Sequence, residues 1–190
     1  MTSGVHHVNN LASLTVLVHH RWALPVLGEL YRDDGAKFVT LVHRLNVSKD
    51  SLARTLEHLR ILDLAVKNPG YGHPLRPEYV LTPHGQVLGS STLPLLKHAQ
   101  RLGILELLLK KWSLPVIWAV HHGFGRFTDL LGALPHVTSR ALSLAVQDLE
   151  RIELLQREGS SYQLTNHGLE VAALLETLTE SLPESLAETR

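Results

Sequence analysis

The chain carries Arg21-Trp22-Ala23-Leu24-Pro25-Val26-Leu27 and, 90 positions further on, Lys111-Trp112-Ser113-Leu114-Pro115-Val116-Ile117. Two more stretches recur in the same order behind each of these segments. The first pairs Lys37-Phe38-Val39-Thr40-Leu41 with Arg126-Phe127-Thr128-Asp129-Leu130. The second pairs Tyr79-Val80-Leu81-Thr82-Pro83-His84-Gly85 with Tyr162-Gln163-Leu164-Thr165-Asn166-His167-Gly168. Self-similarity over 21–85 and 111–168 predicts one small unit built twice, which we call copy one and copy two.

Copy one has the pattern of three helices, a hairpin and a further helix. Amphipathic spacing predicts helices over 22–33 and 38–46. Ser48 is suited to cap a third helix, which has a leucine stripe on its inner face. Extended runs at 64–67 and 78–81 predict the two strands of the hairpin. This order of elements is typical of a winged helix-turn-helix.

Copy two repeats the pattern with different residues. Its short second helix ends at Pro135, and Thr138 is suited to cap the third helix. Extended runs at 154–158 and 161–164 predict a hairpin with only Gly159-Ser160 between its strands. Agreement between two separately varied copies strengthens the prediction of the fold.

The recurring string resembles a known family. It is similar to the HxlR-type winged-helix transcription regulators, relatives of the MarR group. The similarity lies in four elements that follow one another: Trp-x-Leu-Pro, then Lys or Arg before Phe-x-x-Leu, then Ser or Thr before x-x-x-Leu-x-x-x-(Leu or Val)-x-x-Leu, and then Tyr-x-Leu-Thr-x-x-Gly. The resemblance covers 21–88 and again 111–171, and it implies a bacterial or archaeal DNA-binding regulator that works as a homodimer of single winged helices. This chain departs from the family pattern by carrying two copies, and it lacks the cysteine that some relatives use for sensing.

Leucine-rich segments at 5–20, 83–109 and 165–180 flank the copies and are expected to be helical, with breaks at Pro94 and Gly103. In the resembled family such helices form the dimer interface. We therefore expect a mainly α (α+β) fold of tandem winged helix-turn-helix domains, with small β-hairpin wings and long flanking helices in a pseudo-two-fold arrangement. The expected domains are 1–92 and 93–190. The chain would be a monomer with an internal pseudo-dimer, or a homodimer, and a small-molecule effector would fit between the flanking helices.

Composition limits the classes of function. The 190 residues include 18 basic and 18 acidic side chains, so any DNA binding would depend on local basic patches rather than on net charge. The chain has no cysteine, which excludes disulfides and thiolate zinc sites. It has no apolar run of about 18 residues and no signal-peptide start, which indicates a cytoplasmic protein without a membrane span.

Histidine is abundant, with 13 residues that include the pairs His6-His7, His19-His20 and His121-His122. Neighbouring helical residues point in different directions, so these pairs are expected to be solvated or partly packed rather than metal-binding. No cofactor is expected, and surface charge would respond to mild acid.

Double-stranded DNA is the expected partner. In a helix-turn-helix, the N-terminal half of the third helix meets base edges in the major groove. In copy one, the candidate contacts on this helix, on the wing and beside the preceding helix are Lys37, Ser48, Lys49, Ser51, Arg54, Thr55, His58, His73 and Arg76. In copy two the candidates are Arg126, Thr138, Ser139, Arg140, Ser143 and Gln147.

Copy one is expected to dominate DNA binding. The counterparts of Arg54, Thr55 and His58 in copy two are Leu144, Ala145 and Asp148, and an outward Leu144 would suit a protein surface. The alternative function is therefore a tandem winged-helix module for protein–protein interaction, as in chromosome organisation or complex assembly. An enzyme is the weakest interpretation, because no phosphate-binding glycine loop or catalytic triad order stands out.

Overall fold

The computed structural model describes residues 3–70, 72–73, 76–183 and 186. The first helix, α1 (Ser3–Leu17), leads into a set of helices and a hairpin that we call the first unit. It comprises α2 (Ala23–Arg32), α3 (Phe38–Leu45), α4 (Lys49–Ile61), β1 (Ala65–Lys67), β2 (Tyr79–Leu81) and α5 (Pro83–Arg101).

The short α6 (Leu105–Leu108) precedes the second unit. That unit comprises α7 (Ser113–His121), α8 (Phe127–Ala133), α9 (Ser139–Arg151), β3 (Leu155–Glu158), β4 (Ser161–Leu164) and α10 (Asn166–Glu180). The helical content and the two small antiparallel hairpins agree with the predicted mainly α winged helix-turn-helix class.

Each hairpin is extended by a bridge to the loop in front of the second helix of its unit. β1 and β2 pair with Val66 opposite Val80, and Ala36 bridges to Tyr79 with both backbone hydrogen bonds at 2.9 Å. In the second unit Arg126 bridges to Ser161. The bridges hold the wing against the helix-turn-helix in the same way in both units.

The recurring Thr-x-x-Gly has a physical cause at the joint between hairpin and helix. The Thr82 hydroxyl accepts a hydrogen bond from the Gly85 amide at 3.1 Å, and Thr165 does the same for Gly168 at 3.1 Å. A Cβ at Gly85 would lie 1.9 Å from the Leu64 carbonyl oxygen, and one at Gly168 would lie 2.1 Å from that of Leu154. Only glycine lets α5 and α10 start this close to the backbone that joins the third helix of each unit to its hairpin.

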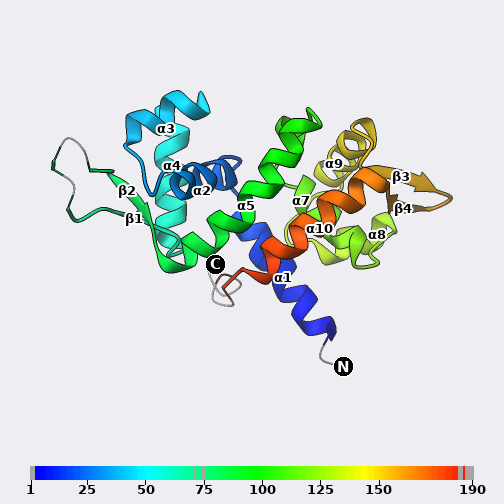
Figure 1. Cartoon of the computed structure of the whole chain (residues 1–190). Coiled ribbons are helices and arrows are strands. Elements are labelled where there is room, and N and C mark those ends of the chain that lie inside the picture. The colour runs from blue at the N-terminus through cyan, green and yellow to red at the C-terminus, as the bar shows by residue number, and fades with distance from the viewer. Residues whose placement is uncertain (1–2, 71, 74–75, 184–185, 187–190) are drawn as a thin grey trace.

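The units are in contact along helices from both halves. Figure 1 shows α5 and α10 next to each other in the middle of the molecule, where they pack together, with the first hairpin on one side and the second on the other. At one end of this contact the Ser91 and Ser181 hydroxyl oxygens are 2.9 Å apart. α1 packs against α7 and α10 of the second unit. The apolar core is therefore continuous from α1 to α10.

One predicted break is wrong. Pro94 lies inside α5, which continues to Arg101, whereas Gly103, with a φ of 68°, follows the end of that helix as predicted. Ser90, four residues before Pro94, keeps its hydroxyl bonded to the Val87 carbonyl at 2.7 Å. Pro94 has no amide hydrogen, so α5 loses one backbone hydrogen bond there. Packing of α5 against α2 and α10 keeps this stretch helical.

Candidate nucleic-acid interface

α3 and α4 form the helix-turn-helix of the first unit. α3 ends at Asn46, whose φ of 48° is left-handed. The predicted cap is confirmed, because the Ser48 hydroxyl accepts a hydrogen bond from the Ser51 amide at 3.2 Å. A side-chain cap satisfies an amide that the first turn of a helix otherwise leaves unpaired.

The exposed residues at the start of α4 are of mixed charge. Lys49, Asp50 and Arg54 are exposed, while Ser51 is half-buried with its hydroxyl 2.9 Å from that of Ser48. Arg54 is well suited to fork onto a guanine edge. Asp50 stabilises the helix start but repels phosphate, so the basic residues of this surface work against one acid.

The burial of Thr55 contradicts its predicted role in DNA contact. Its side chain is 1% exposed, and its hydroxyl donates to the Ser51 carbonyl at 2.8 Å. Thr55 lies at one edge of the inward face that Leu52, Leu56 and Leu59 form, so the buried face of α4 is wider than its leucines alone indicate.

His58, also predicted to contact DNA, is turned toward α1. Its Nε2 atom lies 3.0 Å from the Val16 carbonyl oxygen. The ring centroid of His20 is 4.7 Å from that of His58, and the ring of His19 is 5.2 Å from His20. A cluster of three histidines, His19, His20 and His58, therefore joins the end of α1 to the side of α4.

The three imidazoles share an environment that favours their neutral forms. Burial, and next the proximity of His20, lower the pKa of His58, against smaller opposing effects of the α1 carbonyls. Burial, then His19 and Arg54, lower the pKa of His20. Burial and Lys111 lower the pKa of His19. Charging any one of these rings is unfavourable while the other two and the two cations stay nearby.

The first wing and the start of α3 supply the remaining candidates of copy one. His73 and Arg76 are exposed, and the Arg76 guanidinium donates to the Gly70 carbonyl at 3.1 Å. Residues 71, 74 and 75 of the predicted loop lie outside the described residues. Lys37 is half-buried at the N-terminal cap of α3, close to the bridge that ties the wing down.

The second unit presents a different surface. Thr138, Ser139 and Arg140 are exposed at the start of α9, where the Thr138 hydroxyl accepts from the Ala141 amide at 3.2 Å as predicted. Leu144, at the position of Arg54, is 55% exposed. The other candidates of this copy are the exposed Gln147 and Arg126 and the half-buried Ser143.

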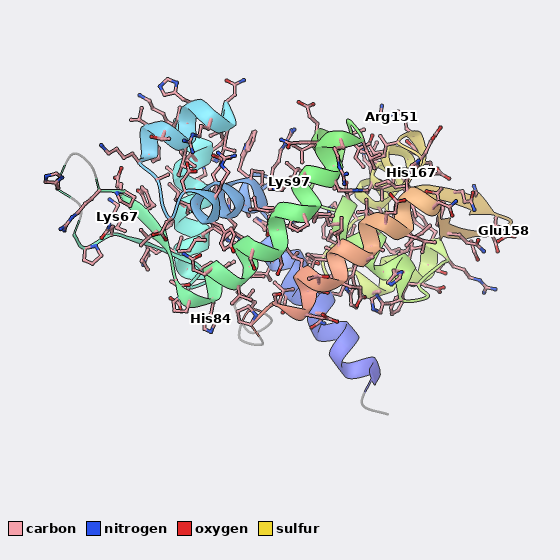
Figure 2. The ribbon with its side chains drawn as sticks, in the orientation of Figure 1. Lys67, His84, Lys97, Arg151, Glu158 and His167 are labelled. Atoms are coloured by element: carbon pink, nitrogen blue, oxygen red, sulfur yellow. The ribbon has the colours of Figure 1, made fainter. Side chains whose placement is uncertain are left out.

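The second wing is short and partly acidic. Its strands are joined through Gly159, whose φ of 60° makes the tight turn. Figure 2 shows Glu158 near the tip of this hairpin, where a carboxylate repels a phosphate backbone.

One contact that the sequence did not predict joins the third helix of each unit, α4 or α9, to the segment just before Trp22 or Trp112. In the second unit the Lys110 ammonium is 2.5 Å from the Asp148 carboxylate, which also binds Arg151 at 2.7 Å. In the first unit the equivalent positions, 90 residues earlier, are His20 and His58. In the sequence, the only indication of this contact is that His20 and His58 are separated by the same number of positions as Lys110 and Asp148.

Comparisons with known proteins identify the family. The HxlR-like helix-turn-helix family matches residues 107–189. An uncharacterized HTH-type transcriptional regulator of Methanocaldococcus jannaschii is 30% identical over 81 residues, which are 40% of this chain and 76% of that protein. The chain belongs to the HxlR-like helix-turn-helix family. No solved structure matches it.

The HxlR-like match lies on the second unit and the α6 segment before it, although the more polar recognition helix is α4 of the first unit. Among the described residues no group of three or more His, Cys, Asp or Glu side chains is arranged to hold a metal ion. No described helix is both long and apolar enough to cross a membrane.

Proposed function

We propose that this HxlR-like protein is a cytoplasmic DNA-binding transcription regulator built as two winged-helix domains in one chain, residues 1–92 and 93–190. The observation that carries the proposal is the recurrence of helix, helix, helix, hairpin and helix, with the same threonine caps and close glycines, in a chain of this family.

The proposed arrangement is an intrachain pseudo-dimer. Two observations support it: α5 and α10, the equivalent helices of the two units, pack on each other, and α1 packs on α7 of the opposite unit. Such exchange of helices between halves is what a two-fold dimer of single winged helices would need. Two recognition helices in one chain would then meet successive parts of one duplex.

The first unit is proposed to contribute most of the sequence-specific contact. Support comes from the exposure of Lys49 and Arg54 on α4, against the exposed Leu144 on α9. The proposed contacts of the first unit are Lys37, Ser48, Lys49, Ser51, Arg54, His73 and Arg76. Those of the second are Arg126, Thr138, Ser139, Arg140, Ser143 and Gln147.

Fluorescence anisotropy with genomic duplexes, including the region upstream of the protein's own gene, tests the proposal. Binding should weaken steeply with salt, with a log–log slope of about −0.9 for each phosphate neutralised. Arg54→Ala should lose more affinity than Arg140→Ala. Equal or reversed losses would contradict the leading role of the first unit, and the absence of salt-dependent binding to any duplex would contradict DNA binding itself.

One observation favours a second candidate, a winged-helix module for protein–protein interaction. Leu144 is exposed on the face of α9 that would read DNA, and the net charge of the chain is zero. If Leu144→Glu leaves duplex binding unchanged but releases a co-purifying protein, α9 is an interaction surface.

A further inference from the structure

A cavity of about 310 Å³ lies beside Trp22, between the first unit and the segment that leads to the second. Its size is at the lower end of pockets that bind small molecules. The apolar walls are formed by Trp22, Pro25, Leu93, Leu96, Leu105 and Leu109. These residues come from the start of α2, from α5 and from the α6 segment. A ligand in the cavity would therefore contact both the first unit and the connection to the second unit.

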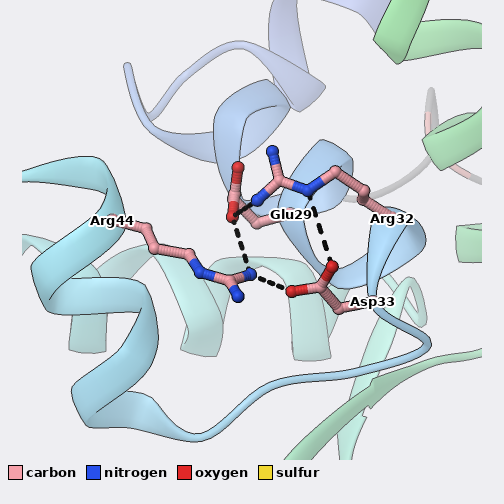
Figure 3. Close-up of polar contacts among 4 residues, drawn as sticks. All are labelled: Glu29, Arg32, Asp33 and Arg44. Carbon is pink, nitrogen blue, oxygen red and sulfur yellow. Dashed lines mark hydrogen bonds and ion pairs between the residues drawn. The ribbon is translucent and has the colours of Figure 1, made fainter.

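Cations surround the mouth of this cavity, and they differ in how they are engaged. Arg44 pairs with Asp33 and lies 3.4 Å from Glu29, and Arg32 also binds both carboxylates (Figure 3). These four residues neutralise one another and fix α3 to the end of α2.

Two other cations at the cavity have no acidic partner among the residues that the structure describes. Lys97 of α5, labelled in Figure 2, is exposed and forms no hydrogen bond or ion pair with any residue in the described part of the chain. The Arg21 guanidinium lies over the Trp22 ring, 5.6 Å from its centroid. Glu106 is the one acid at the mouth outside the ion-pair network among the described lining residues. The uncompensated charge at the mouth is therefore positive.

The position of Gly28 on α2 corresponds to that of Trp118 on α7 in the second unit. Gly28, in the cavity wall, stands six residues after Trp22, as Trp118 stands six residues after Trp112. Trp118 is 2% exposed, and its ring stacks on His122 with centroids 3.8 Å apart and planes 18° apart. In the first unit leucines of α5 cover the corresponding position, because a Cβ at Gly28 would lie 3.0 Å from Leu96 and 3.2 Å from Leu93.

The residue that stacks on that ring also has a counterpart. Arg32, at the cavity, occupies the position of His122. Guanidinium groups stack on aromatic faces. A planar ring that entered the cavity would contact Leu93 and Leu96, which cover Gly28, and would lie within reach of Arg32, while an acidic substituent would meet Lys97.

We propose that this cavity is the binding site of a small aromatic carboxylate. The apolar walls, which include Trp22, favour the ring, and Lys97 and Arg21 favour the negative charge. An effect of the ligand on DNA affinity rests on the proposed function, because the cavity joins α2 and α3 to the connection between the units. Binding of the ligand by itself does not depend on that function.

Isothermal titration calorimetry without DNA tests the site, with benzoate and naphthoate as probes and the corresponding alcohols as neutral counterparts. The acids should bind more tightly than the alcohols. Lys97→Gln should weaken binding of the acids by about threefold or more and leave the alcohols unaffected. Glu106→Gln is the matched control, since it removes an exposed charge of opposite sign from the same mouth and should tighten binding of the acids.

Leu105→Trp, which fills the cavity from its wall, should abolish binding of acids and alcohols alike. If neither acid saturates the protein by about 10 mM, or if Lys97→Gln and Glu106→Gln both leave acid binding unchanged, the proposal is overturned. A duplex titration with and without benzoate is read separately. Saturable, Lys97-dependent binding of the acids without any duplex binding would support the ligand site and contradict the proposed DNA-binding function.

Discussion

The Nε2 atom of His58 lies 3.0 Å from the carbonyl oxygen of Val16, so α4 is hydrogen-bonded directly to the end of α1. The contact lies one ring away from His20, whose pKa Arg54 helps to lower. A titrating cluster therefore stands between the helix that packs on the second unit and the side chain proposed to read DNA.

Folding stability should fall in mild acid because of this cluster. The folded state lowers the pKa of His19, His20 and His58 below their ordinary value of 6.5, so below that pH the unfolded chain binds more protons. The stabilising contribution is complete above that value and is lost as the pH falls. Urea unfolding from about pH 8 to about pH 5.5 should show the loss.

His58→Gln should flatten that pH profile while its amide keeps a donor near the Val16 carbonyl. Loss of the imidazole should cost about 1 kcal/mol at neutral pH. His43→Gln removes an exposed histidine of α3 and is the matched control. A profile for His58→Gln as steep as that of the unaltered protein would show that the cluster does not govern the acid response.

The ion pair of the second unit offers a replacement for the cluster. The double variant His20→Lys and His58→Asp gives the first unit the same lysine and aspartate that form the ion pair Lys110–Asp148 in the second unit. Neither new group titrates near neutral pH, so most of the pH dependence of stability should disappear, whatever the stability at neutral pH. Urea midpoints for the double variant that still fall with acid as in the unaltered protein would contradict this prediction.

The glycines behind the threonine caps should tolerate no side chain. Gly85→Ala and Gly168→Ala should each destabilise the chain by about 2 kcal/mol, because the new Cβ would overlap a backbone carbonyl oxygen. Gly132→Ala in α8 has open space around its Cβ and should be neutral or stabilising, by less than about 1 kcal/mol. Thermal unfolding compares the three. Equal effects would show that the close approach at the helix starts is not rigid.

A reciprocal exchange should reveal which recognition helix reads DNA. Arg54→Leu gives α4 the residue of α9, and Leu144→Arg gives α9 that of α4. The first change should weaken duplex binding and relax its sequence preference, and the second should strengthen binding, because it adds a cation to α9. Anisotropy with a preferred and an unrelated duplex measures both. Stronger binding by Arg54→Leu would place the DNA surface elsewhere.

Much of the local structure could be predicted from the sequence. The helix caps at Ser48 and Thr138 and both hairpins follow from residue types with strong local preferences. The break predicted at Pro94 is wrong, because the local effect of a proline does not include the packing of α5 against two other helices.

The candidate interface was predicted in part. Lys49 and Arg54 are exposed as expected, whereas Thr55 is buried and His58 faces α1. A leucine stripe marks the centre of a buried face but not its width, since the width depends on how closely the neighbouring helices approach.

By itself the sequence determined that one helix-and-hairpin pattern occurs twice, because caps, turns and amphipathic spacing depend on residues a few positions apart. The tertiary structure alone decided that α1 meets α4 through histidines and that a cavity opens beside Gly28. Both features depend on which distant segments come together and how closely, and residue spacing along a chain does not record the distance between helices.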